Sequence, residues 1–258
     1  MNFDKIPSNT QILPLGQPRF HEGGDEAVLL VHGFTGMTSN FFYLFDRLVS
    51  EGYTVSLPRL PGHASNAADF HESTGHDWLR CVVDEYVLLQ SRYKTVYIAG
   101  LSMGGLLTLI LAALFDPAKI VVMAPAISIR NKLVFKTPFL KYFIHSVKGS
   151  WKEEDEDDEE RRTLGRAYWA RTDVIKVADM IALRKRALKN LSRVKSPTLT
   201  IVSEGDKTVA PDAVQIIENG ISSNRKEHIV LVESPHVLVN GCERKEVADR
   251  IIDWFKKE

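Results

Sequence analysis

The chain has 258 residues, of which 44% are hydrophobic, 26% charged and 9% aromatic. This composition is typical of soluble globular proteins and excludes collagen-like, disulfide-scaffold and wholly disordered chains. Lys plus Arg and Asp plus Glu both total 33, so no overall field attracts nucleic acid or an anionic membrane.

The N-terminal sequence MNFDKIPSNT has no apolar run long enough for a signal peptide, so we expect a cytoplasmic protein. The longest apolar run, residues 106–115, is about half of what a membrane helix needs, and it predicts a buried helix. Cys81 and Cys242 form no CxxC pair, so we expect no zinc knuckle and no redox motif. A disulfide is not expected in a reducing compartment.

Short β-branched runs alternate with helical patterns over the first 124 residues. The expected strands are residues 27–31, 53–57, 95–99 and 119–123. The expected helices between them are residues 39–50, 77–90 and 103–114. This alternation predicts an α/β protein in which helices cover both faces of a mostly parallel sheet.

The same alternation returns near the C-terminus. It gives strands over residues 198–202 and 228–232, a helix from about Pro211, and a final amphipathic helix over residues 243–256. Residues 125–196 show no strand pattern and are too long for a plain loop. We therefore expect a core of residues 1–124 and 197–258, interrupted by a helical cap insertion over residues 125–196.

Charge is distributed unevenly within this insertion. Residues 153–160 are eight consecutive acids, and residues 161–195 contain 11 basic and 2 acidic residues. The basic stretch suggests a polyanion site, but the neighbouring acids compete for it, with Asp157/Arg161 and Asp158/Arg162 spaced to pair on a helix. We favour a solvated, internally neutralised face and expect no nucleic-acid partner.

The segment Gly100-Leu101-Ser102-Met103-Gly104-Gly105 lies between a predicted strand and an apolar helix. A serine on so tight a turn has strained backbone angles, which need small residues two positions before and after it. The turn raises the hydroxyl above the sheet edge at a helix N-terminus, where developing negative charge is stabilised. The simpler alternative is a glycine-rich turn that only allows close packing.

This segment resembles the nucleophile elbow of the α/β-hydrolase superfamily. Further motifs support the resemblance along almost the whole chain: HGFTG at residues 32–36, PRLPGH at 58–63, EGDKTV at 204–209 and SPHV at 234–237. It implies the α/β-hydrolase fold, with Ser102 as nucleophile, Asp206 as acid and His236 as base. It also implies an oxyanion hole formed by the backbone N–H groups of Phe34 and Met103.

Several positions have an alternative interpretation. Glu204 stands two residues from Asp206 and could serve as the acid, and Pro235 replaces the commoner glycine before His236. The segment from His71 to His76 nearly matches H-E-x-x-H, but one extra residue moves the second histidine off the helix face, so we expect no metal site. The aromatic run over residues 135–143 forms either packed cap core or the wall of an acyl pocket.

Within the superfamily, the chain looks most like bacterial carboxylesterases and monoacylglycerol lipases. The resemblance implies a cytoplasmic hydrolase of small-molecule carboxylic esters with short- to medium-chain acyl groups, including monoacylglycerols. It acts through an acyl-serine intermediate, without a cofactor and without stable membrane insertion. The alternatives are a carbon-carbon bond hydrolase or an aminopeptidase on the same triad, and a non-catalytic ligand sensor on the same fold.

Overall fold

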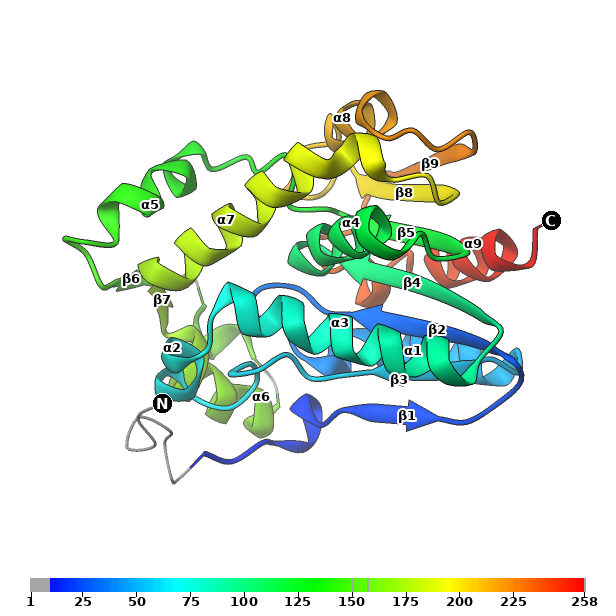
Figure 1. The fold of residues 1–258 in the computed structure, drawn as a ribbon. Coiled ribbons are helices and arrows are strands. Elements are labelled where there is room, and N and C mark those ends of the chain that lie inside the picture. The colour runs from blue at the N-terminus through cyan, green and yellow to red at the C-terminus, as the bar shows by residue number, and fades with distance from the viewer. Residues whose placement is uncertain (1–9, 150, 157, 258) are drawn as a thin grey trace.

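A seven-stranded sheet forms the centre of the computed structural model, which describes residues 10–149, 151–156 and 158–257 (Figure 1). The strand order is β1-β3-β2-β4-β5-β8-β9, and every neighbouring pair is parallel except β1 and β3. The strands are β1 (Arg19–His21), β2 (Glu26–Val31), β3 (Thr54–Leu57), β4 (Thr95–Leu101), β5 (Lys119–Met123), β8 (Thr198–Ser203) and β9 (Lys226–Leu231). All six strands expected from the sequence are present, and β1 was not expected.

Helices cover both faces of this sheet. They are α1 (Phe42–Ser50), α2 (Ala67–Glu72), α3 (Gly75–Arg92), α4 (Met103–Phe115), α8 (Ala213–Gly220) and α9 (Arg244–Lys256). One apolar core lies between the sheet and α1 with α9, and the other lies between the sheet and α3, α4 and α8. The fold class expected from the sequence is therefore confirmed.

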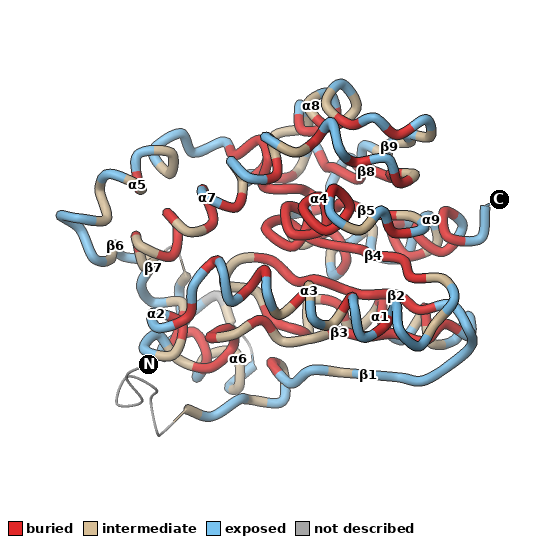
Figure 2. The backbone as a smooth tube through the Cα atoms, in the orientation of Figure 1, coloured by how far each residue is buried: buried red, intermediate tan, exposed pale blue. Residues whose placement is uncertain are grey.

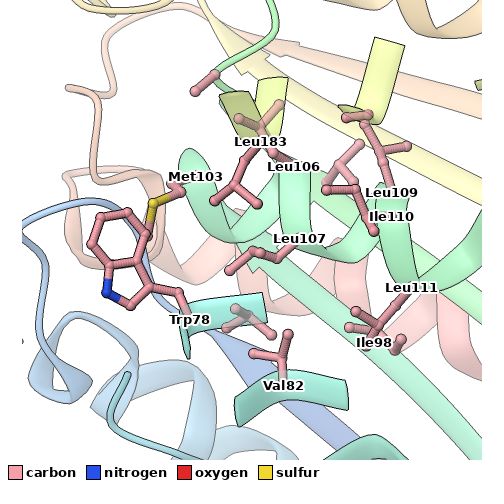
Figure 3. Packing of buried hydrophobic residues seen from close by; sticks show 14 of the residues in the cluster. Trp78, Val82, Ile98, Met103, Leu106, Leu107, Leu109, Ile110, Leu111 and Leu183 are labelled. Atoms are coloured by element: carbon pink, nitrogen blue, oxygen red, sulfur yellow. The ribbon is translucent and has the colours of Figure 1, made fainter. Parts of the chain in front are cut away.

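Helix α4 lies in the middle of the larger core (Figure 3). Its residues 103–113 are all buried, as the apolar run in the sequence predicts. Trp78 and Val82 of α3 pack near it, and Leu183 approaches from the insertion. Thr108, the one polar side chain in the run, donates its hydroxyl proton to the Gly104 carbonyl at 2.9 Å, so its burial leaves no polar group unpaired.

The insertion lies beyond the carboxyl edge of the sheet (Figure 1). It contains α5 (Thr137–Leu140), β6 (Ser146–Lys148), α6 (Glu159–Leu164), β7 (Arg171–Asp173) and α7 (Val174–Asn190). The insertion contains helices, as expected, and also a strand pair that was not expected: β6 and β7 pair antiparallel, with Val147 opposite Thr172. Each of these strands has three residues, which is too short to show a period of two in the sequence.

Part of the acidic run is paired with basic side chains of the insertion, through other pairs than expected. Arg161 pairs with Glu156 at 2.6 Å, and Arg166 pairs with both Glu153 and Glu159. Asp158 accepts a hydrogen bond from the Arg161 backbone and thereby caps α6, so it does not pair with the Arg162 side chain. The expected Asp157/Arg161 pair lies outside the described residues.

The segment that resembles a metal motif instead holds α7 on the core. His71 contacts Asp173 at 2.5 Å, and the buried Lys176 ammonium donates to the Ser73 carbonyl at 2.5 Å. Asp179 accepts from the Gly75 N–H at 3.4 Å. These three polar contacts fix the N-terminal half of α7 against the connection between α2 and α3.

Candidate active site

Ser102 stands on the turn between β4 and α4 with φ 57° and ψ −113°. This conformation is rare for a residue with a side chain, and it requires close packing on both sides. A Cβ at Gly100 would lie 2.3 Å from the Gly104 carbonyl oxygen, and one at Gly104 would lie 2.0 Å from the Val31 carbonyl oxygen. Both glycines are therefore required by the close approach of backbone, as the sequence indicated.

Backbone hydrogen bonds hold this turn in place. The Ser102 N–H donates to the Met123 carbonyl at 2.8 Å, and the Ser102 carbonyl accepts from Ala126 at 3.1 Å. The Ser102 side chain itself makes no helix-capping bond, so its hydroxyl is available for other contacts. The residue is 8% exposed, at the first turn of α4.

His236 links Ser102 to Asp206. The Ser102 Oγ lies 2.9 Å from Nε2 of His236, and Nδ1 of His236 lies 2.8 Å from Oδ2 of Asp206. A carboxylate can only accept, so Nδ1–H donates to Asp206, and Nε2 is then free to accept the Ser102 proton. Three segments far apart in the sequence thus form one hydrogen-bonded chain, and Pro235 does not prevent it.

Asp206 is 2% exposed, and burial alone would raise its pKa. The hydrogen bond and charge of His236, together with the N–H groups of Thr208 and Val209, outweigh burial and lower the pKa below its usual value. The carboxyl is therefore a carboxylate near neutral pH. Glu204 is exposed, and His236 contacts Asp206 instead of Glu204.

The loop over residues 33–36 lies directly beside the nucleophile. A Cβ at Gly33 would lie 3.2 Å from the Ser102 Cβ. Within the part of the chain that the structure describes, the N–H groups of Phe34 and Met103 donate to no backbone carbonyl outside their own elements. These two donors are the ones that the sequence resemblance implies for an oxyanion hole.

His32 holds the loop over residues 33–36 through hydrogen bonds of its two ring nitrogens. Its Nε2 accepts from the Leu60 N–H at 3.1 Å, which leaves the proton on Nδ1, 3.0 Å from the Gly33 carbonyl. Complete burial lowers the His32 pKa to about 4 and lowers the His63 pKa well below its usual value. Repulsion from a protonated His32 lowers the His63 pKa further. Both rings are neutral near pH 7, and they meet edge to face at 5.1 Å.

Glu243, which sequence reasoning missed, holds the loop that carries His236. Its carboxylate accepts the N–H groups of Val232, Glu233 and Ser234 at 2.7–3.3 Å. The Ser234 hydrogen bond is the main cause that lowers the Glu243 pKa. The only available signal was an acid at the N-terminus of the last helix, which the helix dipole alone would explain.

The insertion reaches the site through Trp169. Its Nε1–H donates to the Thr35 carbonyl at 2.9 Å, next to Phe34. A cavity of about 320 Å³ opens beside this contact, and its lining includes Thr35, Trp151, Tyr168 and Trp169.

The aromatic run over residues 135–143 fits neither expected interpretation as a whole. Phe139, Tyr142 and Phe143 are 67%, 74% and 70% exposed, so they neither pack in the cap nor line a closed pocket. Phe135 is half-buried, and the Arg184 guanidinium lies 4.7 Å from its ring centroid. Only Phe135 packs as the structural interpretation requires.

Among the described residues, no cluster of three or more His, Cys, Asp or Glu side chains is arranged to hold a metal ion. The described helices include none that is both long and apolar enough to span a bilayer.

Comparison with family models identifies the family of the chain. Residues 28–250 match the model described as the alpha/beta hydrolase family. The chain belongs to this family. This α/β hydrolase is 32% identical over 249 residues to the thermostable monoacylglycerol lipase of Bacillus sp. (strain H-257), covering 95% of the chain and 96% of that protein. It is 28% identical to a carboxylesterase of Bacillus subtilis (strain 168), covering 93% and 96%.

Solved structures show the same architecture. One of the metagenome-derived lipolytic enzymes LipS and LipT superposes with a TM-score of 0.86 at 30% identity, covering 96% of this α/β hydrolase and 100% of that chain. The monoacylglycerol lipase of Paleococcus ferrophilus gives a TM-score of 0.74 at 18% identity, covering 92% and 98%, and this likeness bears on the fold alone.

Proposed function

We propose that this α/β hydrolase is a carboxylic ester hydrolase that acts on short- to medium-chain acyl esters, including monoacylglycerols, through an acyl-Ser102 intermediate. The hydrogen-bonded chain from Asp206 through His236 to Ser102, on a strained turn, is the observation that carries the proposal. The family membership and the two bacterial relatives support the ester substrate class.

In the first half of the reaction, the Ser102 Oγ attacks the acyl carbon while Nε2 of His236 takes its proton. Asp206 keeps the proton on Nδ1 and stabilises the imidazolium that forms. The N–H groups of Phe34 and Met103 bind the oxyanion of the tetrahedral intermediate. His236 then protonates the leaving alcohol, and water hydrolyses the acyl-serine by the reverse sequence of proton transfers.

The insertion supplies selectivity in this proposal. We assign residues 125–196 to a cap and residues 1–124 and 197–258 to the catalytic core. The support is the Trp169–Thr35 contact, which brings the cap against the loop over residues 33–36, next to Ser102.

The same proposal places the reaction in the cytoplasm, without a cofactor. Its support is that Cys81 and Cys242 are both free thiols, which fits a reducing compartment. The proposal assigns no oligomeric state.

A fluorophosphonate probe tests the nucleophile. The unmodified chain should be labelled at Ser102, and the Ser102→Ala protein should not be labelled. Retained labelling of Ser102→Ala would move the nucleophile to another residue.

A substrate panel tests the reaction class. We expect turnover of p-nitrophenyl esters and monoacylglycerols that far exceeds turnover of amides and vinylogous diketones. Preferred cleavage of amides would indicate an aminopeptidase, and preferred cleavage of diketones a carbon-carbon bond hydrolase. Labelling without turnover of any substrate would indicate a ligand sensor.

A further inference from the structure

Among the described residues, exposed apolar side chains are concentrated on the cap at residues 132–148, which we call the cap tip. Exposed and intermediate residues predominate along this part of the backbone (Figure 2). The cap tip carries six of the thirteen large apolar side chains that are exposed in the described residues: Leu133, Phe139, Tyr142, Phe143, Ile144 and Val147. The other seven are distributed over the remainder of the fold. Since isolated exposed apolar residues are ordinary, the concentration of six within one short segment marks an interaction surface.

The cap tip also carries basic side chains and no acidic ones. Lys132, Lys136, Lys141 and Lys148 lie within it, and no Asp or Glu occurs between Asp116 and Glu153. None of these four lysines forms an ion pair with an acid in the described part of the chain. The balanced total charge therefore conceals a local positive field at the cap tip.

The backbone of the cap tip is ordered by its own hydrogen bonds. Lys141, Phe143 and Ile144 donate to carbonyls of residues 137 and 140 at 2.9–3.0 Å. Helix α5 packs on α7, and the buried Thr137 donates to the Val134 carbonyl at 2.6 Å. The aromatic side chains project from this supported turn, and the rings of Phe139 and Phe143 lie 5.3 Å apart.

We propose that the cap tip docks this enzyme on an anionic lipid surface. Aromatic and aliphatic side chains surrounded by lysines are the combination that favours the interface of an acidic bilayer. A second copy of this chain is a poorer partner for the cap tip, because the four lysines of one copy would lie against the four lysines of the other. The proposal rests on the proposed function only in that docking would bring the cap to the acyl esters that a lipid surface holds.

The position of the cap tip suits delivery of such a substrate. β6 lies at its end and pairs with β7, and β7 begins two residues after Trp169. Trp169 in turn contacts the oxyanion loop. A docked cap would therefore place the cap side of the active site toward the lipid without inserting a helix into it.

Vesicle binding tests the proposal independently of catalysis. Co-flotation uses the Ser102→Ala protein with phosphatidylcholine vesicles, alone or with about one third phosphatidylglycerol. We expect stronger binding to the acidic vesicles. Phe139→Ser with Phe143→Ser should weaken that binding about tenfold or more. Lys136→Gln and Lys148→Gln should each weaken it about fivefold at low salt and should change little on neutral vesicles.

Matched controls lie elsewhere on the surface. Phe20→Ser removes a 51% exposed aromatic side chain from the edge strand β1, and Lys94→Gln removes an exposed lysine between α3 and β4. Neither should change vesicle binding. Equal losses of vesicle binding in these control variants would overturn the proposal. So would equal binding to vesicles with and without phosphatidylglycerol. Self-association of the unmodified chain that is lost in the Phe139→Ser, Phe143→Ser protein would assign the surface to a second copy instead.

Turnover separates this proposal from the proposed function. With Ser102 present, the two Phe→Ser changes should lower hydrolysis of monoacylglycerol in acidic vesicles about tenfold and leave a soluble p-nitrophenyl ester unaffected. Soluble esterase activity without any vesicle binding would remove the docking proposal and keep the ester hydrolase. Vesicle binding without turnover of any ester would keep the docking proposal and remove the ester hydrolase.

Discussion

The elbow at Ser102 and the cap tip are built in opposite ways. At the elbow, backbone atoms approach so closely that a single Cβ at Gly104 would lie 2.0 Å from a carbonyl oxygen. At the cap tip, Tyr142 and Phe143 leave 74% and 70% of their surface exposed. At the elbow, close backbone packing leaves no room for a larger residue at the glycines, whereas the aromatic side chains of the cap tip project outward and stay mostly exposed. Replacing the serine of the elbow should accordingly alter chemistry, replacing its glycines should alter stability, and substitutions at the cap tip should alter only interactions.

The largest expected effect is on the nucleophile. Ser102→Ala should lower kcat/KM for p-nitrophenyl esters by about 10⁴-fold or more, because the acyl intermediate cannot form. Thermal unfolding should be nearly unchanged. Activity within about tenfold of the unmodified enzyme would show that Ser102 is not the attacking group.

Asp206 gives the next largest effect. Asp206→Asn should lower kcat by about 10³- to 10⁴-fold, since the amide no longer fixes the proton on Nδ1 of His236. Glu204→Gln is the matched control on the same loop, and it should retain nearly full activity. A larger loss in the control would reassign the acid to Glu204.

Stability should distinguish the core from the cap tip directly. Phe70 is 4% exposed and packs on Trp78, so Phe70→Ala should lower the free energy of unfolding by about 3–5 kcal/mol. Phe139→Ala at the cap tip should change it by no more than about 0.5 kcal/mol. Urea denaturation of the two proteins measures both values, and similar losses would mean that the cap tip is packed in solution.

Acid should weaken the core through His32 and His63. Both pKa values are lower in the folded chain than in the unfolded chain, so the unfolded chain binds more protons below about pH 6.5, and stability is lost as the pH falls toward 4. For His32 alone the shift corresponds to about 3 kcal/mol. Urea denaturation between pH 6.5 and 5 should show the decline. A free energy of unfolding that stays constant over that interval would contradict buried neutral rings.

The smallest effect on activity should come from Glu243, which accepts hydrogen bonds from the backbone of the loop that carries His236. Glu243→Gln keeps the size of the side chain but can no longer accept three N–H groups equally, so the loop of His236 should loosen and kcat should fall about tenfold. KM should change less than kcat. Glu246→Gln on the exposed face of α9 is the control and should leave kcat unchanged.

The sequence predicted those strands, helices and site residues that a pattern of neighbouring residues is enough to indicate. The strands ending at residues 31, 101 and 203 place side chains at one edge of the sheet, and Gly100 and Gly104 indicated the strained serine between them. Strand β1 was not predicted, because it has only three residues, two of them exposed, and shows no alternation of apolar and polar residues. The pairing of β6 with β7 was missed for a similar reason, since it depends on a partner 25 residues away.

Other features depend on which way a side chain faces, and composition does not determine that. The residues over 135–143 are aromatic whether they pack inward or project outward, so the sequence suggested burial that Phe139 and Phe143 do not show. Glu243 was missed because its three acceptor bonds are made to a loop that only the tertiary fold brings to it. Total charge likewise concealed the basic segment, because the acids that balance it lie elsewhere in the chain.

The hydrogen bond from Trp169 to Thr35 joins the cap to the loop over residues 33–36. A ligand of either part that changes this contact would also change binding at the other part. Thermodynamic reciprocity then requires equal and mutual effects: if a transition-state analogue on Ser102 strengthens attachment of the cap to another surface, that attachment strengthens binding of the analogue by the same factor. The affinity of the enzyme for such an analogue would then depend on whether the cap is bound to that surface.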